Sequence, residues 1–310
     1  MSIQSNKLGA DQLEARGIKA RAESRPAALF DKYKKRSLTF NTRDTDKVVN
    51  TSHYFNIHIT QQTSAEDLFA KDPVCILAPE GEIGPFWVKA ELIRYGISDG
   101  EDGIPVYLEW QFIDINTCEP IEVYSSVQSS MNGNGNDDSN LDKTFLRGIQ
   151  KTDADGVASF KSVFPGHYSG RATHVHVVAH LGATLLPNNT LTGGYVPHIG
   201  QLFFDQDLVN EVEATYPYNT NTVAITENAE DHVVIVETED SDSDPFFQYA
   251  LLGDSIEDGL VARVTLGVNV TASHDSAVSY AATLTSYGGV SNGNAAGDAQ
   301  LPSGSGAPPA

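Results

Sequence analysis

Residues 164–180 read Phe164-Pro-Gly-His-Tyr-Ser-Gly-Arg-Ala-Thr-His-Val-His-Val-Val-Ala-His180. The second half of this stretch is rich in small and β-branched residues and is typical of a β-strand. Because side chains two positions apart leave a strand on the same face, His174 and His176 are expected to point the same way. Arg171 lies three residues before the first histidine, and Tyr168 lies six before it. The pattern predicts two imidazoles that converge on one metal ion, with an oxygen ligand and a cation nearby.

A pair of histidines on a strand also has simpler explanations. Most such pairs are core or surface histidines, and a tyrosine or an arginine in a turn is common on a protein surface. A zinc hydrolase built on this pair would need a third histidine or carboxylate ligand, and the spacing of the sequence offers no candidate. His180 shares the face of the pair but lies farther along the strand, so we expect a supporting or structural role. His167, which immediately precedes Tyr168, is expected to be exposed in the turn.

Short apolar runs separated by clusters of glycine, proline, asparagine and aspartate extend from Pro73 to Ser273. This pattern is typical of many strands joined by turns. The expected strands cover residues 105–115, 157–163, 173–181, 199–204, 232–238, 247–252 and 260–270. Since no long helical periodicity interrupts them, we predict an all-β fold, an immunoglobulin- or prealbumin-like β-sandwich over residues 73–273.

The two ends of the chain differ from this central region. Residues 1–72 are predicted to form an arm that is helical over residues 7–36 and irregular over residues 37–72. Such an arm would suit a homodimer contact. Residues 286–310 are low in complexity and are expected to form a disordered tail, because they can bury too little apolar surface to fold.

The composition excludes several classes of function. Aspartate and glutamate outnumber lysine and arginine by 41 to 20, which gives a formal net charge of −21. Nucleic acid and anionic membrane surfaces are therefore not expected partners, because both bind to a basic face. No apolar stretch approaches the ~18–20 residues of a transmembrane helix.

The compartment and the redox state stay open at this point. The first residues lack the apolar core of a signal peptide, so the sequence taken literally is not exported. The tripeptides that begin at Asn50, Asn188 and Asn269 are N-glycosylation acceptors and would fit a secreted protein instead. Cys75 and Cys118 permit either one disulfide or two unpaired thiols.

Several motifs resemble, in the same order along the chain, those of the intradiol ring-cleavage dioxygenases, in particular the fungal branch. They are Leu77-Ala-Pro-Glu-Gly-Glu-Ile-Gly-Pro-Phe86, Ile113-Asp-Ile-Asn-Thr-Cys-Glu-Pro120, Phe145-Leu-Arg-Gly-Ile-Gln150, Thr152-Asp-Ala-Asp-Gly156 and the stretch over residues 164–176. The resemblance covers roughly residues 45–270, and its last motif is specific.

The resemblance implies a non-haem ferric enzyme that needs no organic cofactor. Its metal ligands would be Tyr124, Tyr168, His174 and His176, together with a solvent-derived hydroxide; Fe(III) is a hard ion that suits phenolate oxygen. Arg171 would lie beside the substrate ring, and Tyr168 would act as a general base. The implied substrates are O2 and a small aromatic diol such as a catechol or a hydroxyquinol. The ring would break between the two hydroxyl-bearing carbons, and both oxygen atoms of O2 would enter the product.

The chain departs from the family pattern just before Tyr124. In relatives a whole strand lies between the Cys-Glu-Pro motif and the turn that carries this tyrosine, whereas here Cys118-Glu-Pro-Ile121 runs straight into Glu122-Val-Tyr-Ser125. The loss of a strand predicts unpaired sheet edges, a large void and a Tyr124 hydroxyl that does not reach the iron. It favours an alternative function, a catalytically impaired or non-enzymatic β-sandwich that acts as a binding or surface module.

Overall fold

The structure is a computed structural model, and it describes residues 45–55, 76–84, 86–130, 140–239 and 244–293. The predicted helix over residues 7–36 lies outside these residues, as do Cys75 and the end of the predicted tail. Among the described residues, no helix combines the length and the apolar character that a membrane crossing requires. Cys118 is disulfide-bonded.

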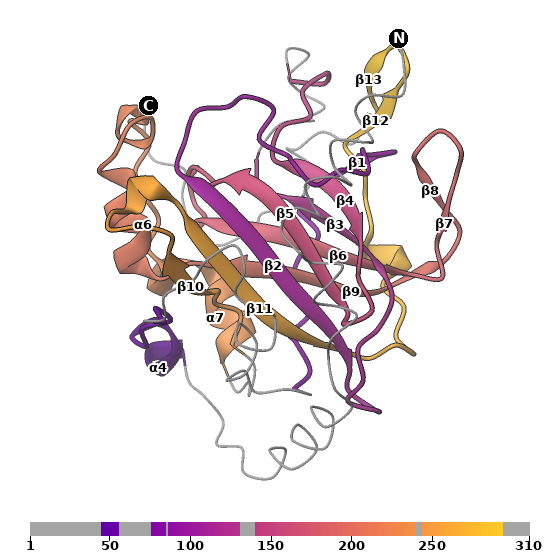
Figure 1. The fold of residues 1–310 in the computed structure, drawn as a ribbon, viewed down its shortest axis with the longest axis horizontal. Coiled ribbons are helices and arrows are strands. Elements are labelled where there is room, and N and C mark those ends of the chain that lie inside the picture. The colour runs from indigo at the N-terminus through magenta and orange to yellow at the C-terminus, as the bar shows by residue number, and fades with distance from the viewer. Residues whose placement is uncertain (1–44, 56–75, 85, 131–139, 240–243, 294–310) are drawn as a thin grey trace.

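Two four-stranded sheets form the body of the domain (Figure 1). The first has the strand order β10 (Gln248–Leu251), β11 (Leu260–Val268), β2 (Pro105–Asp114) and β5 (Val157–Val163). The second has the order β4 (Arg147–Lys151), β3 (Tyr124–Gln128), β6 (His174–Leu181) and β9 (Tyr195–Phe203). The prediction of an all-β sandwich is confirmed.

Side chains from both sheets meet in one continuous core. In the first sheet, Trp110 and Phe160 stack with their ring centroids 5.1 Å apart. In the second sheet, Val175 and Val177 of β6 are fully buried in the same core. Because residues alternate along a strand, the histidines of β6 face away from this core. The sheet therefore presents its candidate site on its outer face.

Shorter elements surround the sandwich (Figure 1). Strands β1 (Val88–Lys89), β12 (Ala282–Thr285) and β13 (Gly288–Ser291) form a three-stranded sheet, and β7 (Thr184–Leu185) pairs with β8 (Leu191–Thr192). The α-helices are α4 (Thr45–Val49), α6 (Gln206–Glu213) and α7 (His232–Thr238). Turns of 3₁₀ helix cover Tyr218–Thr220, Asn228–Glu230, Ile256–Asp258 and Asp275–Ala277.

The prediction of a disordered tail from residue 286 is wrong at its start. Strand β13 pairs antiparallel with β12, and the backbone of Gly289 donates to the carboxylate of Asp142 at 2.6 Å. Strand pairing satisfies the backbone without large apolar side chains, so a glycine-rich segment can be ordered on an existing strand. Residues 294–310 lie outside the described residues.

The predicted strand over residues 232–238 is instead helix α7. Its β-branched run favoured a strand, but Asp231 caps the helix by accepting the backbone N–H groups of Val233 and Val234 at 2.7 and 3.3 Å. Val233 and Val234 are buried, whereas Val236 is 69% exposed, so the helix has one apolar face. The cap and this face outweigh the intrinsic preference of valine and isoleucine for strands.

The expected unpaired edges before Tyr124 are also absent. Strand β3 pairs with β4 on one side and with β6 on the other over all five of its residues. Residues 124–128 thus supply a central strand of the second sheet. The sheet is therefore continuous, and the missing residues affect the position of Tyr124 instead.

The described part of the predicted arm packs on its own domain. Val48 of α4 lies in an apolar cluster with Phe203 and Phe246. The ring of His53 contacts the carboxylates of Asp205 at 2.5 Å and Asp244 at 3.1 Å. Burial opposes the charged imidazole, but the two hydrogen-bonded carboxylates outweigh burial and raise the pKa of His53 to about 9. Residues 45–55 are therefore fixed by an ion pair network, and a homodimer contact by the arm stays a prediction.

Candidate metal centre

Three of the predicted site residues lie together on the outer face of the second sheet. The Nε2 atoms of His174 and His176 are 3.1 Å apart, and the hydroxyl of Tyr168 lies 3.3 Å from Nε2 of His174. The histidines come from β6, and the tyrosine comes from the Pro-Gly turn that precedes this strand. The structure thus brings two imidazole nitrogens and one phenol oxygen to a single point.

A backbone carbonyl fixes the orientation of His174. Nδ1 of its ring lies 2.6 Å from the carbonyl oxygen of Ala172, which can only accept a hydrogen bond. Nδ1 therefore carries the proton, and the lone pair of Nε2 is free for another group. An imidazole held through one nitrogen, with the other nitrogen free, is the usual arrangement of a histidine that ligates a metal.

The charges around the pair favour neutral imidazoles. His174 and His176 are only 5% and 6% exposed. Burial and then the positive charge of Arg171 lower the pKa of His174 to about 3. Burial, His174 and Arg171 together lower the pKa of His176 well below its usual value. Burial also raises the pKa of the Tyr168 phenol, and Arg171 offsets part of that increase. Neutral imidazoles are the form that binds a metal ion.

Arg171 is held in place from two sides. Its Nε donates to the carboxylate of Asp231 at 2.8 Å, and its Nη2 donates to the amide oxygen of Gln201 at 2.5 Å. The same oxygen of Asp231 accepts the backbone N–H of Ala172 at 2.6 Å, and its other oxygen caps α7. Gln201 in turn donates to the carbonyl oxygen of Glu82 at 2.9 Å. The guanidinium is thereby fixed beside the Tyr168 phenol.

Gly84, Phe86 and Trp87 lie close to the rings of the candidate metal centre. Gly84 has φ +72°, and a Cβ atom there would lie 2.6 Å from Cε1 and 2.9 Å from Nε2 of His176. Phe86 meets the Tyr168 ring edge to face at 6.3 Å, and Trp87 meets the His176 ring in the same way at 6.3 Å. The glycine is thus required for close approach, and the two aromatic rings shield the donors from water.

Tyr124 is not brought to this point. Its partner across β3 and β6 is His180, which lies four residues beyond His176. At ~3.3 Å per strand residue, this separation is about 13 Å along the sheet. The structure therefore does not bring Tyr124 to the imidazole pair with which it was predicted to share a metal ion. Its neighbour Ser126 contacts His180 at 2.9 Å, which agrees with a structural role for that histidine.

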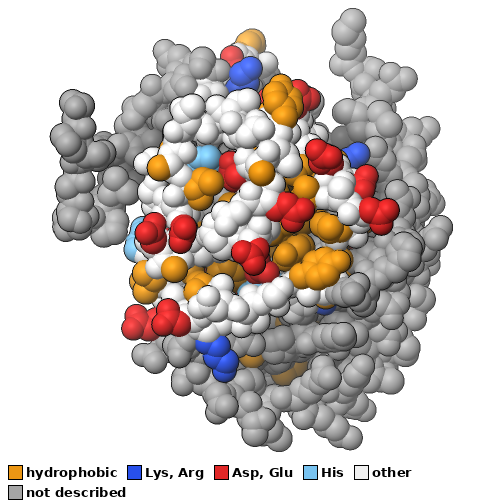
Figure 2. Space-filling model, turned by 90° about the vertical axis from the view of Figure 1, so that its left-hand side faces the viewer, with side chains coloured by type: hydrophobic (Ala, Val, Ile, Leu, Met, Phe, Trp, Pro, Cys, Tyr) orange, Lys and Arg blue, Asp and Glu red, His pale blue; other side chains and the backbone are white. Residues whose placement is uncertain are grey.

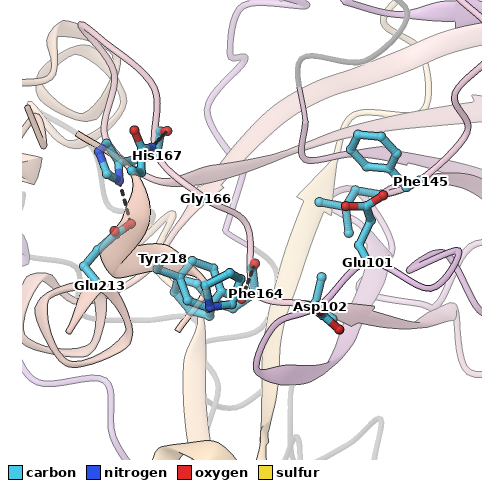
Figure 3. A pocket seen from close by; sticks show the side chains of 12 residues that line it. Glu101, Asp102, Phe145, Phe164, Gly166, His167, Glu213 and Tyr218 are labelled. Atoms are coloured by element: carbon cyan, nitrogen blue, oxygen red, sulfur yellow. Dashed lines mark hydrogen bonds and ion pairs between the residues drawn. The ribbon is translucent and has the colours of Figure 1, made fainter. Parts of the chain in front are cut away.

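His167, the histidine of the turn before Tyr168, is paired elsewhere. His167, predicted to be exposed, is 7% exposed and contacts Glu213 of α6 at 2.7 Å and the carbonyl oxygen of Val223 at 2.8 Å. Figure 3 shows the contact between His167 and Glu213. Both residues line a cavity of about 220 Å³. The lining of that cavity includes neither Tyr168 nor the two histidines of the candidate metal centre. His167 therefore fixes the turn before Tyr168 rather than joining the site.

Sequence reasoning missed Gln201 and Asp231, which hold Arg171. Gln201 on β9 lies directly opposite His176 on β6; both residues are in predicted strands, but the sequence does not give the register between those strands. Asp231 precedes a segment predicted as a strand, and its role as a helix cap was therefore not visible. In the described part of the chain, no three His, Cys, Asp or Glu side chains form a metal-binding group. The donor set at this point is two imidazoles and a phenol, which fits a hard metal ion in part.

No family model matches the sequence, and no curated protein matches it. Two solved structures are similar over most of the described domain. One is a dioxygenase crystal structure with 26% identity and a TM-score of 0.54, covering 65% of this chain and 98% of that one. The other is an intradiol ring-cleavage dioxygenase from Tetranychus urticae with 27% identity and a TM-score of 0.53, covering 64% of this chain and 97% of that one. The chain has the fold of the intradiol ring-cleavage dioxygenases. The predicted resemblance to these dioxygenases is confirmed, and the similarity also supports the general class of enzyme.

Proposed function

We propose that this chain is an intradiol dioxygenase that cleaves an aromatic ring between two adjacent hydroxyl-bearing carbons. Both atoms of O2 enter the product, and a ferric ion is held by Tyr168, His174 and His176. One observation carries this proposal: the phenol oxygen and the two Nε2 atoms meet at 3.3 and 3.1 Å on the fold of a ring-cleavage dioxygenase.

The donors suit iron in kind. The lone pair on Nε2 of His174 is free because Nδ1 donates to a carbonyl oxygen, and burial keeps both imidazoles neutral. Tyr168 contributes a hard oxygen that becomes anionic when the phenol ionises. A bound ferric ion would draw electron density from a chelated aromatic diolate and make the ring reactive toward O2.

The other side chains of the site have separate roles. Once the Tyr168 phenol has ionised, its Oη atom can accept one proton from the substrate diol. Arg171 places a positive charge where negative charge develops on the reacting ring, and its anchoring by Asp231 and Gln201 avoids reorientation during the reaction. The rings of Phe86 and Trp87 exclude water from the donors.

A second function, a β-sandwich that binds ligands without catalysis, has one observation in its favour. Tyr124, the second phenolate that the family resemblance implies, lies across from His180 rather than beside the imidazole pair. A site with one phenolate leaves more uncompensated positive charge on a ferric ion than a site with two. Absence of iron binding would favour this second function.

Oxygen consumption tests the proposal directly. The purified chain is loaded with Fe(III) and supplied in turn with catechol, protocatechuate and hydroxyquinol. We expect oxygen uptake with at least one diol and a ring-opened diacid as product, while a His174→Ala variant stays inactive. If iron-loaded protein consumes no oxygen with any of the diols, the result would contradict the proposed dioxygenase activity and favour ligand binding without catalysis.

A further inference from the structure

A row of four side chains crosses the second sheet at the level of the metal centre. Gln128 of β3 lies directly opposite His176 of β6, with Arg147 of β4 beyond it and Gln201 of β9 on the far side. Residues directly opposite each other in an antiparallel pair project from the same face, with Cβ atoms about 4.5–5.5 Å apart. Gln128 therefore lies beside His176 on the outer face, four residues along β3 from Tyr124.

In the described part of the chain, Gln128 has an amide oxygen without a hydrogen-bond partner, and Nδ1 of the facing His176 is buried and unpartnered as well. Gln128 is 1% exposed, and its Nε2 donates to the carbonyl oxygen of Ser130 at 3.0 Å. Its Oε1 is buried and has no hydrogen-bond partner within the described residues. Buried polar atoms are nearly always paired, so an orphaned oxygen beside an imidazole calls for a ligand that the polypeptide itself does not supply.

Two neighbours in the row, Arg147 and Gln201, have partners of their own. Nε of Arg147 lies 2.8 Å from the carboxylate of Glu91 in a pair that is almost fully buried. The amide of Gln201 is engaged by Arg171 through its oxygen and by the carbonyl oxygen of Glu82 through its nitrogen. The unpartnered oxygen of Gln128 and the imidazoles of His174 and His176 therefore belong to one face of the sheet.

We infer that Gln128 supplies the protein oxygen ligand that Tyr124 was expected to supply, so that the metal is held by Tyr168, His174, His176 and the amide oxygen of Gln128. This inference rests on the proposed function, since it concerns the same metal. An amide carbonyl is a hard neutral donor of the kind that hard cations accept. The exchange replaces one anionic ligand with a neutral one. The centre consequently binds Fe(III) through a single phenolate and with lower affinity than a site with two phenolates.

The test is the affinity of the full chain for Fe(III), measured by competition with a chelator, in wild type, Gln128→Leu and Gln128→Glu. We expect Gln128→Leu to weaken iron binding by at least about tenfold, because it removes a donor and keeps the shape. Gln128→Glu should bind Fe(III) more tightly and shift the visible tyrosinate-to-iron absorption, because it adds an anionic oxygen. Gln111→Leu is the matched control: Gln111 is a buried glutamine of the other sheet, which donates to the carbonyl oxygen of Asp155 at 2.8 Å.

Equal iron affinity in wild type and a folded Gln128→Leu variant would overturn the inference. If Gln128→Leu fails to fold, the glutamate variant decides, since unchanged affinity and an unchanged spectrum there would also overturn it. Wild-type protein that takes up no iron would overturn both this inference and the proposed function. Iron binding that depends on Gln128 without oxygen uptake would uphold the inference and overturn the dioxygenase alone.

Discussion

Residues 164–176 and residues 118–128 contribute to the same sheet, but only the first segment preserves the geometry that the family resemblance implies. In residues 164–176, a turn followed by β6 brings Tyr168, His174 and His176 within hydrogen-bond distance. In residues 118–128, a short connection leads directly into β3, and Tyr124 lies opposite His180 instead. The comparison shows that sheet pairing decides the position of a ligand more strongly than the local motif around it.

The register of the second segment has identifiable causes. Thr152 donates its backbone N–H to the carbonyl oxygen of Val123 at 2.9 Å and accepts the N–H of Val123 on its hydroxyl at 3.0 Å. Ile121 donates to the carbonyl oxygen of Phe112 at 3.1 Å, which ties the connection to β2. Val123 and Val127 are buried in the core. Moving Tyr124 to the level of His176 would require all these contacts to shift by four residues.

Removal of an imidazole should give the largest effect on the first segment. His176→Ala deletes one of the two nitrogen donors, so the metal centre should no longer assemble. We expect the variant to lose its stoichiometric iron and its rate of oxygen uptake to fall by at least about a thousandfold. Metal analysis of the purified variant and an oxygen electrode measure both. His180→Ala, on the same strand and face, is the control and should keep its iron; loss of iron there as well would mean that the comparison of the two segments is mistaken.

A substitution that crowds the imidazole pair should have the next largest effect. Gly84→Ala places a methyl group against the ring of His176 at a backbone φ of +72°. The strained backbone and the overpacking should together lower the free energy of unfolding by ~2–4 kcal/mol and weaken iron binding. Chemical denaturation measures the first effect. Gly193→Ala, at φ +66° with no atom within 4 Å of its Cβ, isolates the backbone contribution. Equal losses in the two variants would show that no steric contact with His176 is made.

Asp231 tests how far the first segment depends on a distant helix. Asp231→Asn keeps the shape of the side chain but removes the charge that faces Arg171 in a fully buried position. Because the guanidinium is left without its ion pair, we expect a loss of ~2–4 kcal/mol in stability and a lower kcat with a smaller change in KM. Urea denaturation and steady-state kinetics separate the two. Unchanged kcat would mean that the anchoring of Arg171 has no part in the reaction.

Raising the pH should lower the free energy of unfolding through a group that lies in neither segment. The folded pKa of His53 is about 9, above its ordinary value of 6.5. A raised folded pKa stabilises the protein fully below pH ~6.5, and this stability is lost as the pH rises through about 9. We expect a decrease of ~3 kcal/mol over that window. His53→Gln should remove the dependence; the same decrease in that variant would assign it to another group.

Much of the fold was predictable because it depends on alternation of apolar residues. The range 157–163 matches β5, and the alternation around Leu260 located β11 within two residues of its end. Helix α7 was mistaken for a strand, since its cap and buried face are tertiary effects that β-branched composition obscures. Figure 2 shows acidic side chains spread over one face of the molecule, as the net charge of −21 indicates.

The site was predictable where its residues are close in sequence. Tyr168, His174 and His176 lie within nine residues of each other on a turn and a strand, so local geometry alone brings them together. Gln128 and Gln201 lie opposite His176 only through strand pairing, and the sequence does not show which residues face each other across a sheet.

The most direct test of the central claim compares Tyr124→Phe with Tyr168→Phe after loading with Fe(III). Tyr124→Phe should keep its iron, its visible charge-transfer absorption and its stability to within about 0.5 kcal/mol, because the Tyr124 hydroxyl lies about 13 Å along the sheet from the imidazole pair. Tyr168→Phe should lose that absorption. A colourless Tyr124→Phe variant would contradict the account, because it would place the hydroxyl of Tyr124 on the metal.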